Sequence, residues 1–531
     1  MNKFLRTFLL LLITEGCDFG SIELDKVKGP SIDNAFAINL GNIKYTVGEL
    51  IDDLEDESLE VTEGSDFSMS FIFRDTSFFD DVDSFVEVGE ITNTDSFSPF
   101  DVDIPAIGTE ATVTIPTKNF EFEFNPENGE RLDSTFFSGG TLTYTLSSDF
   151  DIEIDYILTL KDVKNSDNEP LIFDRTLPAI SSSDSQSRSL AGLKNVSRRI
   201  GSSNIFEVAL DMTLHIPAGK TINASDEVAI ELAFIDSQFS ALFGDFGSDP
   251  VEVQKDSILI SAFDEFSENG LALNNPSITM DFVNTFGVEL GVSLDEITSF
   301  NADNSELTLA GSVVDNNQFV DAPNNTQLGQ GVKSSFSIDK SNSNIDELLN
   351  TTPNKMVFDL TAIPNPPASD NINNYLTDSS YVEIVTTVEI PLDLKMDGFS
   401  KEFELSVSGS DLNDADSLKI NIEVINEIPF NGLLNLSFID DDGNALYTLA
   451  EIALITSPEI GIDGRSTEPT ITLSSVALDE EGIDAFLNST EVIASMSIFT
   501  LGHQDGDFVK IYSDYLLEIH LTAEGKASID L

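Results

Sequence analysis

Three consecutive aspartates, Asp440, Asp441 and Asp442, offer a run of carboxylate oxygens that could ligate Ca²⁺. The run lacks the twelve-residue loop with a terminal glutamate that an EF-hand requires. It is followed by Gly443, and it lies where a hairpin turn is expected after the apolar strand that contains Phe438. We therefore interpret the run as a turn and keep Ca²⁺ binding as the weaker alternative. No other metal ion or cofactor is indicated.

The three histidines, His215, His503 and His520, show no pattern that is typical of catalysis. His215 and His520 alternate with apolar residues, as on the outer face of a strand, and His503 lies in a polar turn. The sequence contains no G-x-S-x-G motif and no glycine-rich phosphate loop. Carboxylates are so abundant that a glycosidase-like pair cannot be located. We therefore expect no catalytic residue, and a carboxylate-dependent hydrolase remains an alternative without motif support.

The charge balance restricts the partners of this protein. Its 531 residues include 94 Asp and Glu against 26 Lys and Arg, which gives a net charge of −68. Such a surface repels phosphate backbones, so we exclude nucleic acids as partners. The 39 Phe and 8 Tyr supply apolar surface for packed cores, which a disordered acidic chain lacks. The acidic residues are therefore expected on the surface of folded domains.

The only cysteine, Cys17, ends an N-terminal stretch with the pattern of a secretory signal. Lys3 and Arg6 precede the apolar run 8–13, which is too short to cross a membrane as a helix. With Gly16 before the cysteine, the stretch resembles a bacterial lipoprotein signal peptide. That resemblance implies cleavage before Cys17 and acylation of the cysteine, whose acyl chains would anchor the protein in the outer membrane. The alternative is an ordinary secretory peptide with an incidental cysteine.

Alternation of apolar and acidic residues dominates the body of the chain. The stretches 120–124 (FEFEF) and 151–156 (DIEIDY) are clear examples. This period of two predicts antiparallel sheets with one buried face and one solvated face. Short helices are expected at 45–54, 345–349 and 478–487. We predict a mainly β protein of three or four antiparallel β-sandwich-like domains in tandem, with few short helices.

Two short motifs recur along the chain. The first is a strand that ends in Ile-Pro, and its prolines are Pro116, Pro217 and Pro391. Proline lacks the N–H that a ladder needs, so these residues are expected at strand ends or sheet edges. The second is a small polar pair followed by an apolar residue and a long strand, and its apolar residues are Phe150, Phe286 and Phe430. The order and spacing predict repeated domains in which the three Phe occupy equivalent buried positions. Chance similarity among strands is the alternative.

Composition shifts supply the expected domain boundaries. Residues 181–203 are rich in serine and carry Arg188, Lys194, Arg198 and Arg199, so we interpret this segment as a linker or exposed loop. A small site for an acidic partner or for lipid headgroups is the alternative. The expected order is 1–16 signal peptide, 17–34 tether, 35–180 first β domain, 181–203 linker or loop, 204–314 second β domain, 315–331 polar linker, and 332–531 C-terminal β domain or domains.

Several stretches carry a family resemblance. They are 343–353 (SNIDELLNTTP), 373–391 (NNYLTDSSYVEIVTTVEIP), 426–444 (NEIPFNGLLNLSFIDDDGN), 509–521 (VKIYSDYLLEIHL) and the opening 43–54 (IKYTVGELIDDL). Through them, and above all through its C-terminal third, the chain resembles uncharacterised outer-membrane or surface lipoproteins of Bacteroidota. The resemblance implies a lipid-anchored β protein at the outer membrane or cell surface, and it supplies no catalytic residues.

Three functions are compatible with these features. The leading hypothesis is a non-enzymatic structural or accessory subunit of a membrane-protein assembly, with an outer-membrane barrel or another surface protein as partner. It would be exposed on the cell surface, with the periplasmic face as the alternative. A glycan-binding lipoprotein of a polysaccharide-uptake system is less favoured, because sugar platforms use Trp and Tyr and this chain has no Trp. The hydrolase is third.

Overall fold

The computed structural model describes residues 32–52, 59–179, 182–260, 271–301, 303–366, 373–406 and 415–529. Strands dominate these ranges, and the strand pairs are antiparallel. The short helices that the sequence predicts are found at the expected places. The helical segments are α1 (Val47–Asp52), α2 (Ile345–Asn350), α3 (Glu480–Asn488) and the 3₁₀ turn η4 (His503–Asp505). The predicted fold class, a mainly β protein with antiparallel sheets and few short helices, is thus confirmed.

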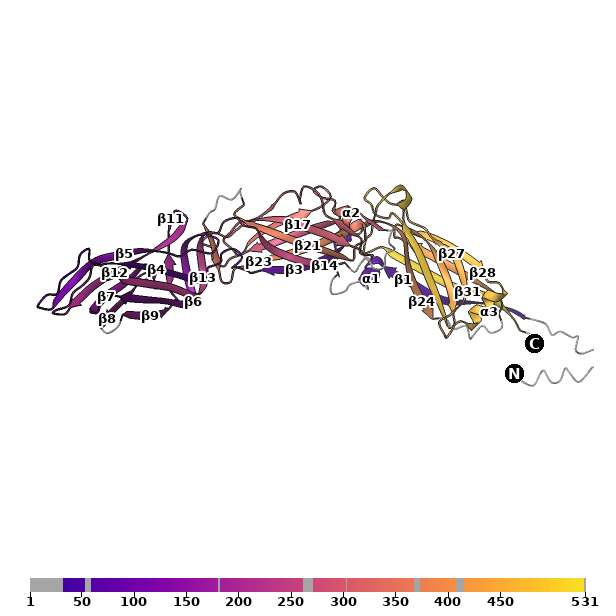
Figure 1. Cartoon of the computed structure of the whole chain (residues 1–531). Coiled ribbons are helices and arrows are strands. Elements are labelled where there is room, and N and C mark those ends of the chain that lie inside the picture. The colour runs from indigo at the N-terminus through magenta and orange to yellow at the C-terminus, as the bar shows by residue number, and fades with distance from the viewer. Residues whose placement is uncertain are drawn as a thin grey trace, which may run out of the picture. The chain divides into compact units, whose positions relative to one another are not determined.

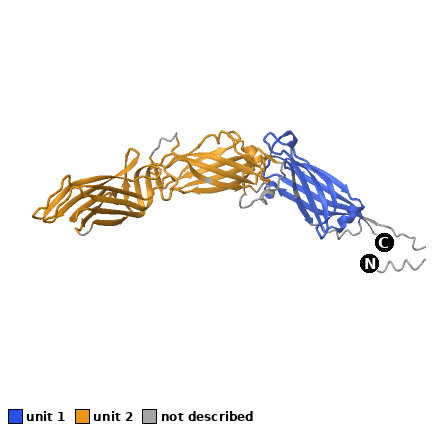
Figure 2. Cartoon of the chain, in the orientation of Figure 1, with its two compact units in different colours: residues 1–50, 395–531 blue, residues 51–394 orange. Residues whose placement is uncertain are grey.

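The chain divides into two compact units (Figure 2). Unit 1 combines the N-terminal residues up to 50 with residues 395–531, and unit 2 contains residues 51–394. Unit 1 therefore takes its strands from both ends of the sequence.

Unit 1 is built on a four-stranded sheet and on four main strands of a second, six-stranded sheet, and we call this pair the terminal roll (Figure 1). The first sheet has the order β1-β31-β25-β28, and its strands are β1 (Ile32–Thr46), β31 (Leu516–Ile529), β25 (Ala415–Asn426) and β28 (Thr470–Ala477). The second has the order β24-β29-β26-β27, and its strands are β24 (Asp393–Ser406), β29 (Glu491–Thr500), β26 (Phe430–Ile439) and β27 (Ala445–Ile455). The short β30 (Val509–Lys510) pairs with β24. Alternate residues such as Ile420, Ile422 and Val424 are buried, which is the predicted period of two.

Unit 2 contains a second pair of sheets, which we call the split roll because three chain segments build it. One sheet contains β2 (Leu59–Glu63), β3 (Met69–Phe79), β23 (Val382–Pro391), β16 (Ser277–Asn284) and β20 (Val332–Ile338), in that order. The other has the order β14-β21-β17-β18, with β19 also on β17, and its strands are β14 (Val251–Leu259), β21 (Lys355–Pro364), β17 (Leu290–Phe300), β18 (Glu306–Thr308) and β19 (Gln318–Val320). The three-residue β15 (Leu271–Leu273) precedes β16.

The inserted roll occupies residues 91–245 of unit 2. One layer has the order β5-β12-β7-β8, and its strands are β5 (Ala111–Glu123), β12 (Ser203–Ile216), β7 (Glu153–Lys164) and β8 (Pro170–Leu177). The other has the order β4-β13-β6-β9, and its strands are β4 (Ile91–Phe97), β13 (Val228–Asp245), β6 (Arg131–Ser148) and β9 (Ser183–Ser189). Three short strands extend these layers: β10 (Lys194–Val196) pairs with both β6 and β7, β11 (Arg198–Ile200) with β12, and β22 (Asn374–Thr377) with β13.

The three rolls share one strand order. Numbered along the chain, the eight main strands of each roll place the first, eighth, third and sixth in one sheet and the second, seventh, fourth and fifth in the other. This is the order of an eight-stranded jelly roll, a double sheet built from two Greek keys. The repeated architecture thus extends over the whole described chain.

The rolls are nested in the sequence instead of following one another. Unit 2, apart from its last two residues, lies between the first and second strands of the terminal roll, β1 and β24. The inserted roll lies between the first and second strands of the split roll, β3 and β14. Both insertions therefore use the same connection of the fold.

The predicted domain boundaries differ from this arrangement. Residues 183–189 of the expected linker 181–203 form β9, which pairs with β6 along its whole length. Residues 318–320 of the expected linker 315–331 form β19 inside the split roll. Residues 35–46, expected in the first domain, pair with the last strand of the chain, with Thr46 opposite Leu516. A polar composition indicates that a segment is exposed, but it does not distinguish a linker from an exposed strand. Both faces of the edge strand β9 are largely exposed, and its composition is therefore that of a linker.

The second repeated motif marks the same corner in each roll, where the chain crosses from one sheet to the other. At the end of the third strand, Ser148, Asn284 and Asn426 each accept a hydrogen bond from the backbone N–H two residues later, at 3.1, 2.9 and 2.9 Å. The residues that donate these bonds are Phe150, Phe286 and Ile428, and all three are buried.

Phe150 and Phe286 therefore occupy the predicted equivalent positions. Phe430 does not, because Ile428 takes its place and Phe430 is only half-buried at the start of β26. The asparagine hydrogen bond selects the residue two positions after Asn426.

The Ile-Pro motif is not part of the repeat. Pro116 lies on the edge strand β5, Pro217 directly follows β12, and Pro391 ends β23, so the three occupy different strands of the fold. Their positions at an edge or at a strand end agree with the missing backbone donor of proline.

Candidate functional site

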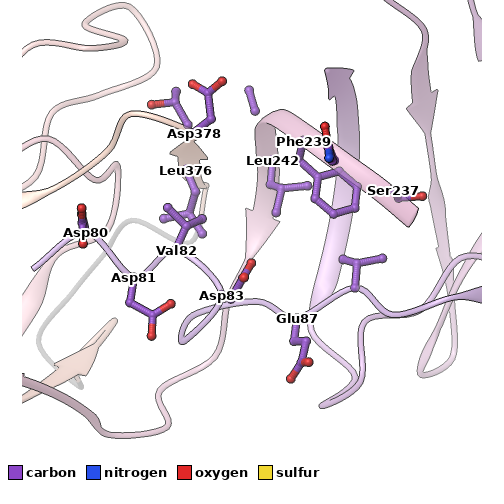
Figure 3. Close-up of a pocket in the computed structure, with 14 residues that line it drawn as sticks. Asp80, Asp81, Val82, Asp83, Glu87, Ser237, Phe239, Leu242, Leu376 and Asp378 are labelled. Carbon is purple, nitrogen blue, oxygen red and sulfur yellow. The ribbon is translucent and has the colours of Figure 1, made fainter. Parts of the chain in front are cut away.

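A cavity of about 450 Å³ lies in unit 2 and is lined by residues of the split and inserted rolls (Figure 3). Three segments build it: residues 80–88, which follow β3, residues 237–242 of β13, and residues 376–378 at the end of β22. The two rolls exchange chain segments at this place, because β22 comes from outside the inserted roll and pairs with β13.

The segment 80–88 is fixed by two buried residues. Phe85 and Val86 are 4 % and 2 % exposed, and the ring of Phe85 lies 4.9 Å from that of Phe286 and 5.8 Å from that of Phe79. Phe286 is the buried corner residue of the split roll. Packing of Phe85 against Phe286 thus fixes the segment 80–88, while the acidic residues on either side of Phe85 remain exposed.

The opposite wall is an irregular part of β13. Its pairing with β6 shifts register repeatedly between Ile235 and Ala241, and Asp236 has a left-handed φ of 49°. Gly140 on β6 has a φ of 100°, and a Cβ there would lie 2.7 Å from the Asp236 carbonyl oxygen. Glycine is therefore required at this close approach. Such a bulge changes the direction in which side chains leave the strand, and Ser237 and Phe239 of this stretch line the cavity.

The lining combines carboxylates with an apolar floor. The acidic residues are Asp80, Asp81, Asp83, Glu87 and Asp378, and the apolar ones are Val82, Val88, Phe239, Ala241, Leu242 and Leu376. Figure 3 shows Val82, Phe239, Leu242 and Leu376 together with the labelled carboxylates that line the cavity. Ser237, Gln238 and Thr377 complete the lining, so no basic, histidine or cysteine side chain is among the lining residues.

The run Asp440–Asp442 forms the hairpin turn between β26 and β27, as the leading interpretation predicts. The Asp440 carboxylate accepts bonds from the backbone N–H groups of Asp442, at 3.0 Å, and Asn444, at 2.7 Å. The bond from Asn444 is the main cause that lowers the pKa of Asp440 below its ordinary value. Within the described ranges, no group of three or more His, Cys, Asp or Glu residues is placed to hold a metal ion.

The histidines make structural contacts. His215 Nε2 lies 2.8 Å from Asp155 Oδ2, and Thr176 donates to the other oxygen of Asp155 at 2.6 Å. The carboxylate therefore stands between the imidazole and the hydroxyl, whereas a nucleophile–base pair needs them adjacent. His503 Nδ1 lies 3.0 Å from the Thr500 carbonyl, and His520 pairs with Glu518 at 3.0 Å.

The basic cluster of 188–199 is mostly engaged within the protein. Arg198 pairs with Glu121 at 3.2 Å, Arg199 donates to the carbonyl oxygens of Gly129 and Glu130 at 3.1 Å, and Lys194 lies over the ring of Phe136. Three of the four cations thus bind groups of the inserted roll, which weighs against a dedicated site for an acidic partner.

A polar network closes one edge of the inserted roll between β8 and β9. The hydroxyls of Tyr144 and Tyr156 are 3.0 Å apart in the core, and Tyr156 donates to Asp184 at 2.6 Å. Arg175 and Gln186 also donate to Asp184, at 3.2 and 2.8 Å. Burial and the bond to Asp184 raise the pKa of Tyr156 well above its ordinary value. A phenol held neutral in this way bridges the two sheets and is unsuited to act as a base.

Two further predictions concern membrane attachment. Cys17 and the expected signal peptide lie outside the described residues. Among the described residues, no helix is long and apolar enough to cross a membrane.

Comparison with known proteins gives distant similarities. No family model matches the chain, and no curated protein matches it. A Parabacteroides distasonis protein described as secreted aligns at 14 % identity over 55 % of this chain and 90 % of its own length, with a TM-score of 0.31. The CBM22 tandem of Paenibacillus barcinonensis Xyn10C aligns at 10 % identity over 54 % and 86 %, with a TM-score of 0.14. An infectious bursal disease virus structure aligns at 9 % identity over 90 % and 82 %, also at 0.14. These scores are too low to support a functional assignment.

Proposed function

We propose that the protein is a lipid-anchored, non-enzymatic β protein of the outer membrane, exposed on the cell surface. It serves as a structural or accessory subunit of a membrane-protein assembly. Its partners are the outer membrane, bound through acyl chains on Cys17, and an outer-membrane barrel or another surface protein.

The composition of the cavity at Asp81 carries this proposal. Its lining offers carboxylates and apolar side chains, which are groups that can bind a ligand. Neither of its two hydroxyls is bonded to a base, because Thr377 Oγ1 lies 2.9 Å from Ser380 Oγ and Ser237 Oγ has no hydrogen-bond partner among the described residues. Two other polar clusters, at Asp155 and at Asp184, have their hydrogen bonds directed at neighbouring strands. Binding is therefore the role that this arrangement supports best.

The glycan-binding alternative finds less support in the same cavity. Sugar rings are held by flat aromatic surfaces, and Phe239 is the one aromatic side chain among the lining residues. Its neighbours on the floor are aliphatic.

The anchor is tested by metabolic labelling with a fatty-acid probe in wild type and Cys17→Ala, with Ser21→Ala as a control that keeps the cysteine. We expect the Cys17→Ala variant to lose the label and to leave the membrane fraction, because the acyl chains are its only attachment in this proposal. Equal labelling of all three proteins would contradict it.

The accessory role is tested by crosslinking in native membranes followed by affinity purification. We expect an outer-membrane barrel or another surface protein to co-purify with wild type and to be lost with Cys17→Ala. The purified ectodomain is also incubated with glycosides, esters and peptides, with and without Ca²⁺. Turnover that disappears in a single carboxylate variant, such as Asp83→Asn, would favour the hydrolase.

A further inference from the structure

The cavity at Asp81 concentrates unpaired negative charge in a concave place. Within the described chain, no hydrogen bond or ion pair reaches the side chains of Asp80, Asp81, Asp83, Glu87 or Asp378. Asp155, Asp184 and Asp514, by contrast, are each bonded to a cation or a hydroxyl. A cleft lined by one sign of charge focuses its potential and raises the local concentration of the opposite ion. The cavity therefore attracts cations.

The floor of the cavity gives this site a second property. Val82, Val88 and Phe239 line the cavity and keep part of their surface exposed, whereas Leu242 and Leu376, opposite each other in the β13–β22 pair, are already covered at 2 % and 0 % exposed. Val82, Phe239, Leu242 and Leu376 are labelled among the side chains that line the cavity (Figure 3). A small hydrated ion would gain nothing from these side chains. A cation with an alkyl stem would bury the stem on the floor and leave its charged head among the carboxylates.

The walls of the cavity are held in place before any ligand arrives. Phe85 packs the 80–88 segment against the corner residue Phe286, and the Asp378 backbone N–H donates to the Ser240 carbonyl at 3.3 Å. The close approach of Gly140 to Asp236 fixes the bulge of β13. A site fixed in this way pays little ordering entropy when it binds. Its volume of about 450 Å³ also falls in the range of ligand sites.

We propose that this cavity receives a lysine side chain presented by the protein partner. The inference rests on the proposed function, which supplies a protein partner, and it names the chemistry by which that partner is recognised. The four methylenes of lysine match the apolar floor, and its ammonium group donates to the carboxylates at the rim. With a net charge of −68, the protein also favours partners that carry basic residues.

The first test uses primary alkylammonium ions as probes, because they reproduce the stem and head of lysine. Isothermal titration of the purified ectodomain compares methylammonium, ethylammonium and n-butylammonium at constant ionic strength. Burial of each CH₂ strengthens binding about fourfold, so n-butylammonium should bind more than tenfold tighter than methylammonium. Equal affinities along the series would mean that only the general negative charge attracts the probes, and they would overturn the proposal.

Matched variants separate the cavity from the general charge of the protein. Asp81→Asn with Asp83→Asn removes two charges at the rim, and Asp167→Asn with Asp174→Asn removes two at exposed positions on and beside β8. We expect the first pair to weaken n-butylammonium binding at least fivefold and the second to leave it unchanged. Val82→Ser should reduce the dependence on chain length. Equal effects of the two pairs would overturn the proposal.

The last test distinguishes this inference from the proposed function. Lysine-directed crosslinking in native membranes compares the two double variants for capture of the co-purifying partner. Loss of capture by Asp81→Asn with Asp83→Asn alone supports the lysine contact. Undiminished capture by both pairs overturns it, while the accessory role stands. If no partner is captured by wild type, the accessory role fails, and with it the partner-borne lysine.

Discussion

The inserted and terminal rolls have the same strand order but differ in the side chains that fill them. In the inserted roll, Phe234 contacts Phe124, Phe137 and Phe206, with ring centroids 5.0 to 5.9 Å apart. In the terminal roll the corresponding layer is mostly aliphatic, with Ile420, Val424, Leu434, Leu436 and Ile519 fully buried or nearly so. The order of strands thus depends on alternation and on the shared corner, and not on particular core residues.

The rolls also close their edges by different means. Between the first and second strands of the inserted roll, Asn93 exchanges two hydrogen bonds of 2.9 Å with the backbone of Glu123. At the same edge of the split roll, Asp75 on β3 instead faces Asp256 on β14, and the two carboxyl groups interact. The contact between the first and second strands therefore differs between these two rolls. In neither roll is it made by the backbone hydrogen bonds of a sheet.

The largest expected effect comes from breaking the aromatic core of the inserted roll. Phe234→Ala removes the ring at the centre of the cluster and should lower the free energy of unfolding by about 3–5 kcal/mol. Chemical denaturation followed by tyrosine fluorescence measures it, because Tyr144 and Tyr156 are buried in the core of this roll. Phe136→Ala, at a position that is 36 % exposed, serves as the control and should cost less than about 1 kcal/mol. Equal losses would mean that the cluster adds nothing beyond ordinary burial.

The shared corner should be more important where asparagine occupies it. Asn426 accepts the bond from Ile428 and also donates to the carbonyl oxygens of Phe430 and Thr456 at 3.1 and 3.0 Å. Among the described residues, the Ser148 hydroxyl takes part in one hydrogen bond, which it accepts from the backbone N–H of Phe150. Asn426→Ala should therefore cost about 2–3 kcal/mol and Ser148→Ala about 1 kcal/mol. Thermal unfolding of the two variants checks the difference, and a larger cost for Ser148→Ala would contradict it.

The network at Asp184 predicts a pH dependence that is specific to the inserted roll. Burial alone would raise the pKa of Asp184, but hydrogen bonds from Tyr156, Arg175 and Gln186 outweigh it and hold the pKa below its ordinary value. The stabilisation is therefore present at neutral pH and is lost as the pH falls through the lowered pKa. Asp184→Asn should cost about 1–2 kcal/mol at pH 7, and its cost should shrink towards pH 3. Unfolding curves at both pH values measure this, and a cost that is independent of pH would contradict it.

The smallest expected effect has the opposite sign and concerns the carboxyl pair of the split roll. Burial, and then the neighbouring Asp256, raise the pKa of Asp75 above its ordinary value. The folded state thus favours the protonated form, and this stability is lost as the pH rises through the raised pKa. Asp75→Asn should stabilise the protein at pH 7 by up to about 1 kcal/mol and have no effect near pH 3. Stabilisation at both pH values would point to a cause other than charge.

The sequence predicts the local features of this fold and misses the long-range ones. Alternation in 120–124 and 151–156 correctly indicates strands, and Phe150 and Phe286 were found from a repeated pattern because each corner is a local hydrogen bond. In 426–430, Ile428 and Phe430 both fit that pattern, and only the bond to Asn426 distinguishes them. The pairing of β1 with β31 joins residues such as Lys44 and Glu518, which are 474 positions apart, and leaves no local trace. Pairing over such distances is decided by the whole fold.

The cavity at Asp81 could not be predicted for the same reason. Its three segments, 80–88, 237–242 and 376–378, meet only because one roll is inserted into another. In the sequence its aspartates are ordinary members of a very acidic chain. A bulge such as that at Asp236 is likewise invisible, since the residue that permits it, Gly140, lies on a different strand.

The nesting of the rolls changes how the protein responds to a broken backbone. In domains that follow one another, a single proteolytic cut between two of them separates the pieces. The inserted roll is joined to the split roll by two covalent crossings, residues 80–90 and 246–250, and also by the pairing of β13 with β22. A cut in either crossing leaves the other intact, so two cuts are needed to detach the roll. A pulling force on the roll is likewise shared by the two connecting segments of the chain.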